Sequence, residues 1–421
     1  MSKLEKYFLK DIAVSQTGPF GSQLHEEDYV VEGTPIVTVE HLGEVGFNLN
    51  NLPMVSEADK ARLSKYTLKE GDIVFSRVGS IDRCTYVSQK EDGWLFSGRC
   101  IRVRVNEKAD ARYIGFYFRQ KYFKEMMLNI SVGATMPSLN TSLMDNLPLF
   151  LPAKATQQKI APVLSALDAK IELNTRINAE LESMAKMLYD YWFVQFDFPD
   201  ENGKPYKTSG GKMVWKEELK RKIPNGWGFG NLSNIGEVIG GSTPSKEIDE
   251  YFSTKGTAWI TPKDLSLNSR NKFITKGELD VSDSGVKAAS LKIMPKGTIL
   301  LSSRAPIGYM AISRQEVTTN QGFKSFVIKD GYSIPYVYYT VKNLIPTMIN
   351  KSGGSTFKEI SASTLKSIPI CIPDKIIIRR YTELVEKIFE RQDILEIENQ
   401  NLSELRDWLL PMLMNGQVRV N

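Results

Sequence analysis

A heptad pattern in residues 157–192 constrains this chain more than any other feature. Apolar and amide residues recur there at alternating steps of four and three residues, and charged residues fill the outer positions. A sustained period of 3.5 residues predicts a long helix that packs lengthwise against another helix. The same pattern returns without a gap in 378–413. The chain is therefore expected to contain two long helices in one shared register.

The globular segments that precede the two helices also repeat. Gly18 of the first segment recurs as Gly241 in the second, and the stretch 131–152 recurs as 352–373. Short alternating apolar stretches bounded by Gly, Pro and Asn predict strands in both segments. A length of 421 residues suits two or three domains. The predicted fold class is α+β, in which a tandem duplication gives two similar mixed α/β domains and two long helices.

This repeat predicts five segments along the chain. The order is domain, helix, connector, domain and helix, with these bounds: 1–152, 153–195, 196–225, 226–373 and 374–421. The connector favours an antiparallel helix pair with a pseudo-twofold axis, in which positions whose numbers sum to 573 face each other. Trp192 then faces Tyr381, and Asn174 faces Asn399 as a lock on the register.

One facing position is unfavourable, because Arg406 lies opposite Leu167. Its guanidinium is expected to turn outward, towards Asp168. At about 1.5 Å per residue the pair is roughly 50 Å long, so the helices are expected to act as a spacer. The inward positions are hereafter called the seam: Leu164, Leu167, Ile171, Asn174, Asn178, Leu181, Leu188, Val385, Ile388, Leu395, Asn399, Leu402 and Leu409.

Catalytic motifs are missing from the sequence. It has no GxxxxGK[ST] loop, no GxSxG elbow and no Asn/Asp-Pro-Pro-aromatic motif of the kind that amino-methyltransferases use, and only two histidines. We therefore expect no catalytic residue, no metal site and no bound cofactor. Three well-separated cysteines, the absence of a signal-peptide pattern and the absence of long apolar runs predict a cytoplasmic protein without a membrane partner.

Two similar domains held apart without catalytic equipment suggest a reader of a two-part ligand. A net charge of +5 permits a nucleic-acid partner without requiring one. If the ligand is duplex DNA, Arg suits guanine, Asn and Gln suit adenine, and Lys and Ser suit phosphates. The candidates for DNA contact are polar residues near predicted strand ends and loops: Arg77, Arg83, Arg99, Arg102, Lys263, Ser302, Arg304, Asn320, Gln321 and Lys324.

A Ser-x-Gly-x-Thr pattern occurs once in each half. It comprises Ser131, Gly133 and Thr135 in the first half, and Ser352, Gly354 and Thr356 in the second. Each copy is interpreted as either a phosphate-binding loop or a structural turn. The first helix also carries more apolar and amide surface than a free spacer needs, which predicts docking of another subunit. The candidates are Gln157, Gln158, Tyr189, Tyr191 and Phe193.

Several long motifs resemble one family. They include TPSK at 243–246, the LPLFLPAKATQQKIAPVLSALDAKIELN run, the WFVQFDFPDENGKPYKTSGGKMVW connector and the closing LRDWLLPMLMNGQV. Together they make the chain resemble the specificity (S) subunit of a type I restriction-modification system over essentially its whole length.

The resemblance implies two target-recognition domains that each read one part of a split, asymmetric DNA sequence, with an antiparallel coiled coil that sets the gap. It also implies two modification subunits, which carry S-adenosylmethionine and methylate adenine, and restriction subunits that use ATP and Mg²⁺. The chain departs from internal symmetry where Arg379 and Arg380 replace Gln158 and Lys159, so docking at that end is expected to differ. The alternatives are a stand-alone regulator that binds a split operator, and an enzyme in its own right.

Overall fold

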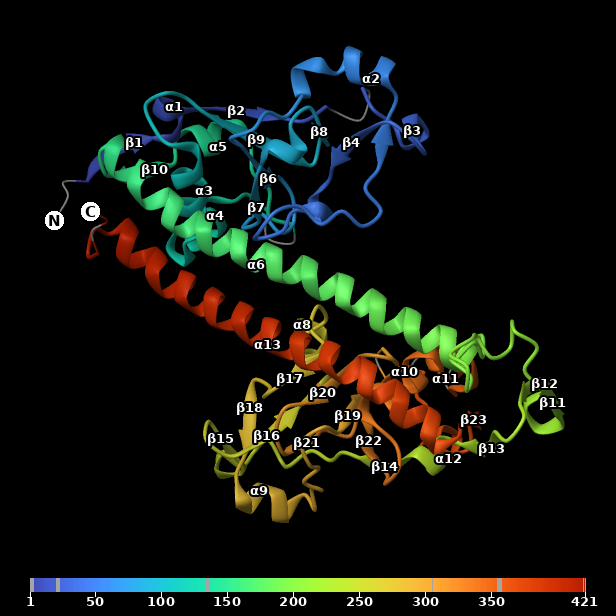
Figure 1. Cartoon of the computed structure of the whole chain (residues 1–421). Coiled ribbons are helices and arrows are strands. Elements are labelled where there is room, and N and C mark those ends of the chain that lie inside the picture. The colour runs from blue at the N-terminus through green and yellow to red at the C-terminus, as the bar shows by residue number, and fades with distance from the viewer. Residues whose placement is uncertain are drawn as a thin grey trace. The chain divides into compact units, whose positions relative to one another are not determined.

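Two compact units make up the chain, and each contains part of both long helices. The computed structural model describes residues 4–19, 23–133, 136–304, 306–353, 358–418 and 420. The first unit joins Met1–Leu173 to Asn399–Asn421, and the second is Asn174–Glu398. Helix α6 (Lys154–Tyr189, green in Figure 1) and helix α13 (Lys375–Met414, red) therefore each contribute one end to each unit.

The first unit contains two four-stranded sheets and a two-stranded one. Their strand orders are β2-β9-β6-β7, β3-β5-β4-β8 and β1-β10. All pairs are antiparallel except β4 with β8. The strands are β1 Glu5–Phe8, β2 Ala13–Thr17, β3 Tyr29–Val30, β4 Thr34–Val37, β5 Met54–Val55, β6 Asp72–Ser76, β7 Cys84–Tyr86, β8 Leu95–Phe96, β9 Cys100–Val105 and β10 Pro148–Leu151. The helices are α1 Leu9–Ile12, α2 Glu57–Arg62, α3 Ala111–Arg119, α4 Lys121–Ile130 and α5 Thr141–Asp145.

The second unit repeats this plan and adds a hairpin in the connector. Its strand orders are β14-β22-β19-β20-β17, β15-β18-β16-β21, β13-β23 and, in the connector, β11-β12. The strands are β11 Met213–Lys216, β12 Arg221–Pro224, β13 Gly228–Asn231, β14 Gly236–Gly240, β15 Phe252–Ser253, β16 Thr257–Ile260, β17 Phe273–Ile274, β18 Leu279–Val281, β19 Ile299–Leu301, β20 Met310–Ser313, β21 Val317–Thr319, β22 Lys324–Ile328 and β23 Pro369–Ile372. The helices are α7 Leu232–Ile235, α8 Pro262–Leu267, α9 Asp283–Ala288, α10 Ile334–Asn343, α11 Ile345–Lys351 and α12 Ala362–Lys366.

The repeat extends to individual backbone hydrogen bonds. Ser97 N–H donates to Val37 O at 2.8 Å, and Asn320 N–H donates to Ile260 O at 3.1 Å. Both partners are shifted by the same sequence offset that relates Gly18 to Gly241. Strand β16 also pairs in parallel with β21, as β4 does with β8. The duplication expected from the sequence is therefore present in the main chain.

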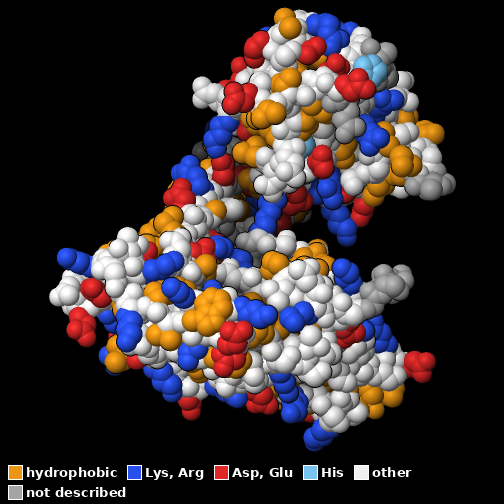
Figure 2. Space-filling model, turned by 90° about the vertical axis from the view of Figure 1, so that its right-hand side faces the viewer, with side chains coloured by type: hydrophobic (Ala, Val, Ile, Leu, Met, Phe, Trp, Pro, Cys, Tyr) orange, Lys and Arg blue, Asp and Glu red, His pale blue; other side chains and the backbone are white. Residues whose placement is uncertain are grey.

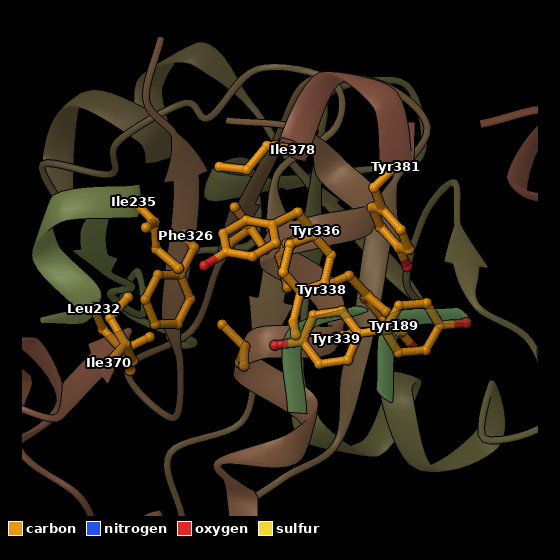
Figure 3. Close-up of a cluster of buried hydrophobic side chains, with 14 of the residues drawn as sticks. Tyr189, Leu232, Ile235, Phe326, Tyr336, Tyr338, Tyr339, Ile370, Ile378 and Tyr381 are labelled. Carbon is orange, nitrogen blue, oxygen red and sulfur yellow. The ribbon is translucent and has the colours of Figure 1, made fainter. Parts of the chain in front are cut away.

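Both helices belong to the hydrophobic cores of the units. In the first unit Ile160, Ala161 and Leu164 of α6 join Leu410 and Leu413 of α13 in one buried cluster with the recognition domain. In the second unit the cluster is rich in aromatic residues (Figure 3), and it contains Tyr189 of α6, Tyr336, Tyr338 and Tyr339 of α10, and Tyr381 of α13. Each domain is thereby fixed to the helix ends that cross its own unit.

The two helices run antiparallel in each unit. In the second unit the rings of Trp192 and Tyr381 lie 5.8 Å apart, and Gln392 Nε2 donates to Asn178 O at 3.3 Å. These contacts confirm the predicted antiparallel pair and the predicted approach of Trp192 to Tyr381. The Trp192 end of α6 closes with a π-helical turn, Asp190–Val194.

In the first unit the antiparallel contact is ionic. Arg406 Nη1 lies 3.1 Å from Asp168 Oδ1, the partner expected from the sequence. The expectation that the guanidinium turns outward is wrong, because Arg406 is only 6% exposed. Two carboxylates, those of Asp168 and Asp407, offset the cost of keeping it inside.

All thirteen seam residues are buried or half-buried. They are Leu164, Leu167, Ile171, Asn174, Asn178, Leu181, Leu188, Val385, Ile388, Leu395, Asn399, Leu402 and Leu409. In the second unit Asn174 Nδ2 donates to Glu398 Oε2 at 3.0 Å, and in the first Asn399 Nδ2 donates to Ile171 O at 3.4 Å. A direct Asn174–Asn399 pair stays a prediction.

Candidate functional site

The end of strand β19 gathers several predicted DNA-contact residues in the second unit. The chain leaves β19 through Ser302 and forms bridges from Ser302 to Phe323 and from Arg304 to Glu359. Gly322 lies at the centre of this region. A Cβ atom added there would lie 3.1 Å from Asn320 Oδ1 and 3.6 Å from Arg304 Nε. Arg304 and Asn320 are therefore neighbours, although strands β20 and β21 lie between them in the sequence.

Charged and amide groups surround this centre. Glu359 lies 3.9 Å from Arg304 Nη1 and 3.7 Å from Lys324 Nζ, so one carboxylate holds two cations. The exposed Gln321 accepts a hydrogen bond from Thr243 of the TPSK loop. Asn320 Oδ1 accepts from Gly322 N–H at 2.9 Å. The arrangement presents one guanidinium, two amides and one ammonium on adjoining loops, which are the groups that read base edges and phosphates.

Two predicted residues of the second unit lie outside this group. Ser302 is fully buried, and its hydroxyl donates to Pro306 O at 2.7 Å and accepts from Tyr309 N–H at 2.9 Å. Its hydroxyl shapes the turn, so the expectation that Ser302 contacts DNA is corrected. Lys263 is exposed on α8 and pairs with Glu278 at 2.6 Å, which raises the pKa of Lys263 through that hydrogen bond.

The first unit has the same strand end with different side chains. Arg77 N–H donates to Arg99 O at 2.8 Å, as Ser303 N–H donates to Gly322 O at 2.7 Å in the second unit. The half-buried Arg77 guanidinium donates to Gly98 O at 3.1 Å. Arg83 and Arg99 are exposed. The first unit therefore presents arginines where the second presents a mixture of amides and cations.

Arg102 is a correction in the first unit. Its side chain is 6% exposed, and Nη1 donates to Thr67 O at 3.0 Å and to Lys65 O at 3.3 Å, while Nη2 donates to Gln16. The guanidinium thus ties β9 to the loop before β6. Because it is turned into the domain, Arg102 cannot reach a base edge.

Glycine is required at one repeated position beside these loops. A Cβ atom on Gly18 would lie 2.1 Å from Ser97 O, and one on Gly241 would lie 2.0 Å from Asn320 O. Contacts this short exclude any side chain. The glycines let the segment after β2 or β14 pass directly against the backbone of Ser97 or Asn320.

The Ser-x-Gly-x-Thr pattern begins with a helix-ending turn. Ser131 Oγ donates to Leu128 O at 2.7 Å after α4, and Ser352 Oγ donates to Ile349 O at 2.6 Å after α11. Gly133 has φ of 106°, which favours glycine. Thr135, Gly354 and Thr356 lie outside the described residues. Both serine hydroxyls are thus engaged in a structural turn.

Most predicted docking residues face inward. Gln157 is 2% exposed and accepts from Asp110 N–H at 2.9 Å, while Tyr189 and Phe193 are 6% and 5% exposed within the aromatic core. These three therefore do not face a partner, which corrects the expectation. Gln158 is exposed and Tyr191 is half-buried.

A different apolar surface lies at the C-terminal end of α6, near Tyr189. Met184, Met187 and Val194 are 53%, 66% and 46% exposed. A surface hollow of about 670 Å³ includes Met187 in its lining, together with Ser183, Lys186, Leu188, Asp190, Tyr191 and Gln195. The signal for this surface in the sequence is apolar residues at outer heptad positions.

No part of the described structure offers a metal site. Among the described residues, no three His, Cys, Asp or Glu side chains gather as metal ligands would. Burial raises the pKa of the Cys84 and Cys100 thiols to about 12, so both stay protonated at neutral pH. Within the same residues no helix is long and apolar enough to cross a membrane. Figure 2 shows Lys and Arg interspersed with Asp and Glu on the face in view, so charge alone does not mark the ligand surface.

Comparison with known proteins places the chain in a family. A family model described as the type I restriction modification DNA specificity domain matches residues 1–183 and 224–405. A type I restriction enzyme specificity subunit from Methanocaldococcus jannaschii is 44% identical over 198 residues, which are 44% of this chain and 45% of that protein. The HindI specificity subunit from Haemophilus influenzae is 27% identical over an alignment that covers 99% of this chain and 100% of that protein.

A solved structure has the same fold. The S subunit of a type I restriction-modification system from M. genitalium matches with a TM-score of 0.61 and 16% identity, over 98% of this chain and 96% of that one. Each of the two matched stretches comprises one recognition domain and most of the long helix that follows it. The chain therefore belongs to the family of type I restriction-modification specificity subunits, the DNA-recognising and non-catalytic component of those enzymes.

Proposed function

We propose that each unit reads one half of a split, asymmetric DNA target and that α6 and α13 set the gap between the halves. The observation that carries this proposal is the repeated strand end. One backbone arrangement recurs in both units, yet Arg77 and Arg99 occupy it in the first while Ser303 and Gly322 occupy it in the second. A backbone arrangement that is the same in both units but carries different side chains suits two domains that read two different DNA sequences.

The chemistry of the exposed groups suggests how each half is read. In the first unit Arg77, Arg83 and Arg99 are the proposed contacts, and arginine pairs best with guanine. In the second unit the proposed contacts are Arg304, Asn320, Gln321, Lys324 and Lys263. Asn and Gln suit adenine, and the lysines suit phosphates.

The partners are proposed from the family and from the apolar surface at the end of α6. Met184, Met187, Tyr191 and Val194, with the exposed Gln158 on the same helix, are the proposed contacts for modification subunits. These subunits would bring S-adenosylmethionine and methylate adenine. Restriction subunits that use ATP and Mg²⁺ would complete the assembly.

The spacer is tested by lengthening both helices at the unit boundaries. One heptad is inserted after Leu173 in α6 and one after Glu398 in α13, which leaves each unit intact. A heptad adds about 10 Å of helix, so the preferred gap should lengthen by up to about three base pairs of about 3.4 Å each. Both half-sites should stay unchanged. Sequencing of methylated adenines in cells that carry the partner subunits gives the readout.

The matched control places the same heptad in the connector turn between Asn202 and Gly203, outside both helices. It should leave the gap as it was. An unchanged gap after the double helix insertion would contradict the spacer. If the purified chain binds a split site tightly but never recruits a methyltransferase, it is a stand-alone regulator instead.

A further inference from the structure

A lysine of the second recognition domain contacts both long helices. Lys272 lies in the loop between α8 and β17, and its side chain is 4% exposed. Its Nζ lies 2.6 Å from Glu182 of α6 and 2.6 Å from Gln392 of α13. It also lies 3.2 Å from the hydroxyl of Tyr339 on α10. An ammonium has three protons to donate, and here three oxygens accept them.

Aromatic rings complete the surroundings of this ammonium. Lys272 Nζ lies 3.7 Å from the centroid of the Phe389 ring on α13, and 5.3 Å and 5.2 Å from those of Tyr338 and Tyr339 on α10. A cation so close to a ring face is attracted to it, more strongly when water is excluded. The ammonium of Lys272 therefore contacts the recognition domain, α6 and α13 at one point.

Retaining a charge here is costly for stability. Burial lowers the pKa of Lys272 to about 8. Burial alone would raise the pKa of Glu182, but the ammonium groups of Lys272 and Lys342 lower it to about 2. Apolar side chains of similar volume commonly serve stability as well as a buried ion pair does. What an ion pair adds is direction, because its bonds are satisfied in one arrangement only.

The loop itself has a separate attachment to α13. Glu396 accepts hydrogen bonds from the backbone N–H groups of Lys272 at 2.7 Å and Phe273 at 3.0 Å. Arg314 pairs with the same Glu396 at 3.0 Å and with Asp393 at 2.5 Å. Removal of the Lys272 ammonium therefore leaves the loop attached, while the link to α6 through this lysine is lost.

We infer that Lys272 is a positioning residue that fixes the angle of the second recognition domain on the helix pair, so that selectivity for the gap length depends on it. The inference rests on the proposed function, in which the gap is read. Without the ammonium, Glu396 still holds the loop to α13, but the loop loses its direct contact with α6, and α10 keeps the domain on α6 through the Lys342–Glu182 pair and the packing of Tyr189. The second half-site is then accepted at neighbouring distances from the first.

The test uses Lys272→Met in the full chain, assembled with its adenine-methylating partner. Methionine keeps an unbranched apolar chain one atom shorter than lysine and removes the charge, and Glu182 keeps Lys342 as a partner at 2.6 Å. The substrates are duplexes with both native half-sites and gaps from two base pairs shorter to two longer. A misplacement of about 1 Å can cost about 100-fold in rate, so the preference for the native gap over its neighbours should fall about tenfold or more. The half-site sequences should stay the same.

Lys287→Met is the matched control, because Lys287 is an exposed lysine on α9 of the same unit. It should keep the native gap preference. If Lys272→Met does not fold, Tyr339→Phe removes one acceptor and keeps the ring, and it should broaden the gap preference in the same direction by a smaller factor.

A folded Lys272→Met protein with the native gap profile would overturn the inference and leave the proposed function intact. A wild-type complex that methylates all gaps equally would overturn both. A uniform loss of rate with an unchanged gap profile would mark Lys272 as structural only, which also contradicts the inference.

Discussion

The two units attach their domains to the same helices in different ways. In the first unit a single carboxylate, Asp168 of α6, takes Arg119 of α3 at 2.5 Å and Arg406 of α13 at 3.1 Å. In the second, Lys342 is the repeat counterpart of Arg119, and it pairs with Glu182 at 2.6 Å beside the buried Lys272. The backbone of the duplicated ancestor is retained, whereas the attachment chemistry has diverged. The two halves of this protein are therefore not interchangeable.

The aromatic core of the second unit should give the largest effect. Tyr381→Ala removes a fully buried ring from this core and should destabilise the second unit by about 3–5 kcal/mol, the usual range for a buried aromatic. Hydrogen exchange should rise in 228–372 and not in 34–105. Leu384→Ala, 54% exposed on the same helix, should stay within about 0.5 kcal/mol. An equal loss of protection from hydrogen exchange in both units would contradict the claim that this core stabilises the second unit alone.

Removal of the first unit's central carboxylate should come next. Asp168→Asn leaves Arg406 buried without its full counter-charge, at a cost of about 3 kcal/mol. The loss of stability should appear as a lower urea midpoint for unfolding of the first unit. Glu172→Gln is the control on the same helix, since its pair with Lys90 is exposed and should contribute less than about 1 kcal/mol. Equal effects of the two variants would show that Asp168 does not hold the unit together.

Two arginines of the first unit should separate binding from stability. Arg99→Ala alters an exposed side chain and should weaken binding to the native target by about 1–3 kcal/mol if the arginine reads a base. Arg102→Met should lower the melting temperature and, once folded, bind DNA as the native chain does. The measurement is titration of labelled duplex at fixed salt, with thermal unfolding alongside. Unaltered binding by Arg99→Ala would remove that residue from the proposed interface.

The smallest effect concerns pH and the second unit alone. Because the pKa of Glu182 is about 2, below its usual 4.5, its stabilisation is complete above pH 4.5 and is lost as pH falls towards 2. The stability difference between the native chain and Glu182→Gln should therefore shrink by about 1 kcal/mol between about pH 6 and about pH 3.5. Urea midpoints at the two values measure it. A constant difference would mean that Glu182 is not the group that titrates.

The heptad pattern predicts much of the fold. Its predictions are wrong where the helices pack against a recognition domain as well as against each other. The period correctly predicts two long antiparallel helices, the approach of Trp192 to Tyr381 and the partner of Arg406. It does not predict that Tyr189 and Phe193 are buried, because each helix packs against a recognition domain as well as against the other helix. A two-helix period describes one of these interfaces only.

The strand pattern likewise did not show which candidate side chains are buried. In β9 the alternation of Arg with apolar residues is typical of a strand with one wet face. Both faces of its first four residues are buried, so Arg102 faces a covered side, where two backbone carbonyls accept from its Nη1. Ser302 was unpredictable for a different reason, since the turn that takes its hydroxyl is set by Pro306 and Tyr309. The residue type alone does not show which loop will turn back and bind a side chain.

The division of the chain into units also has a consequence for its synthesis. The first unit needs residues 399–414 of α13 to cover Ile160 and Leu164, but the whole second unit, Asn174–Glu398, is made in between. At about 5–20 residues per second, the second unit takes roughly 10–45 s to emerge. The recognition domain that leaves the ribosome first is therefore completed last, and its apolar helix face stays uncovered while the second unit is being made.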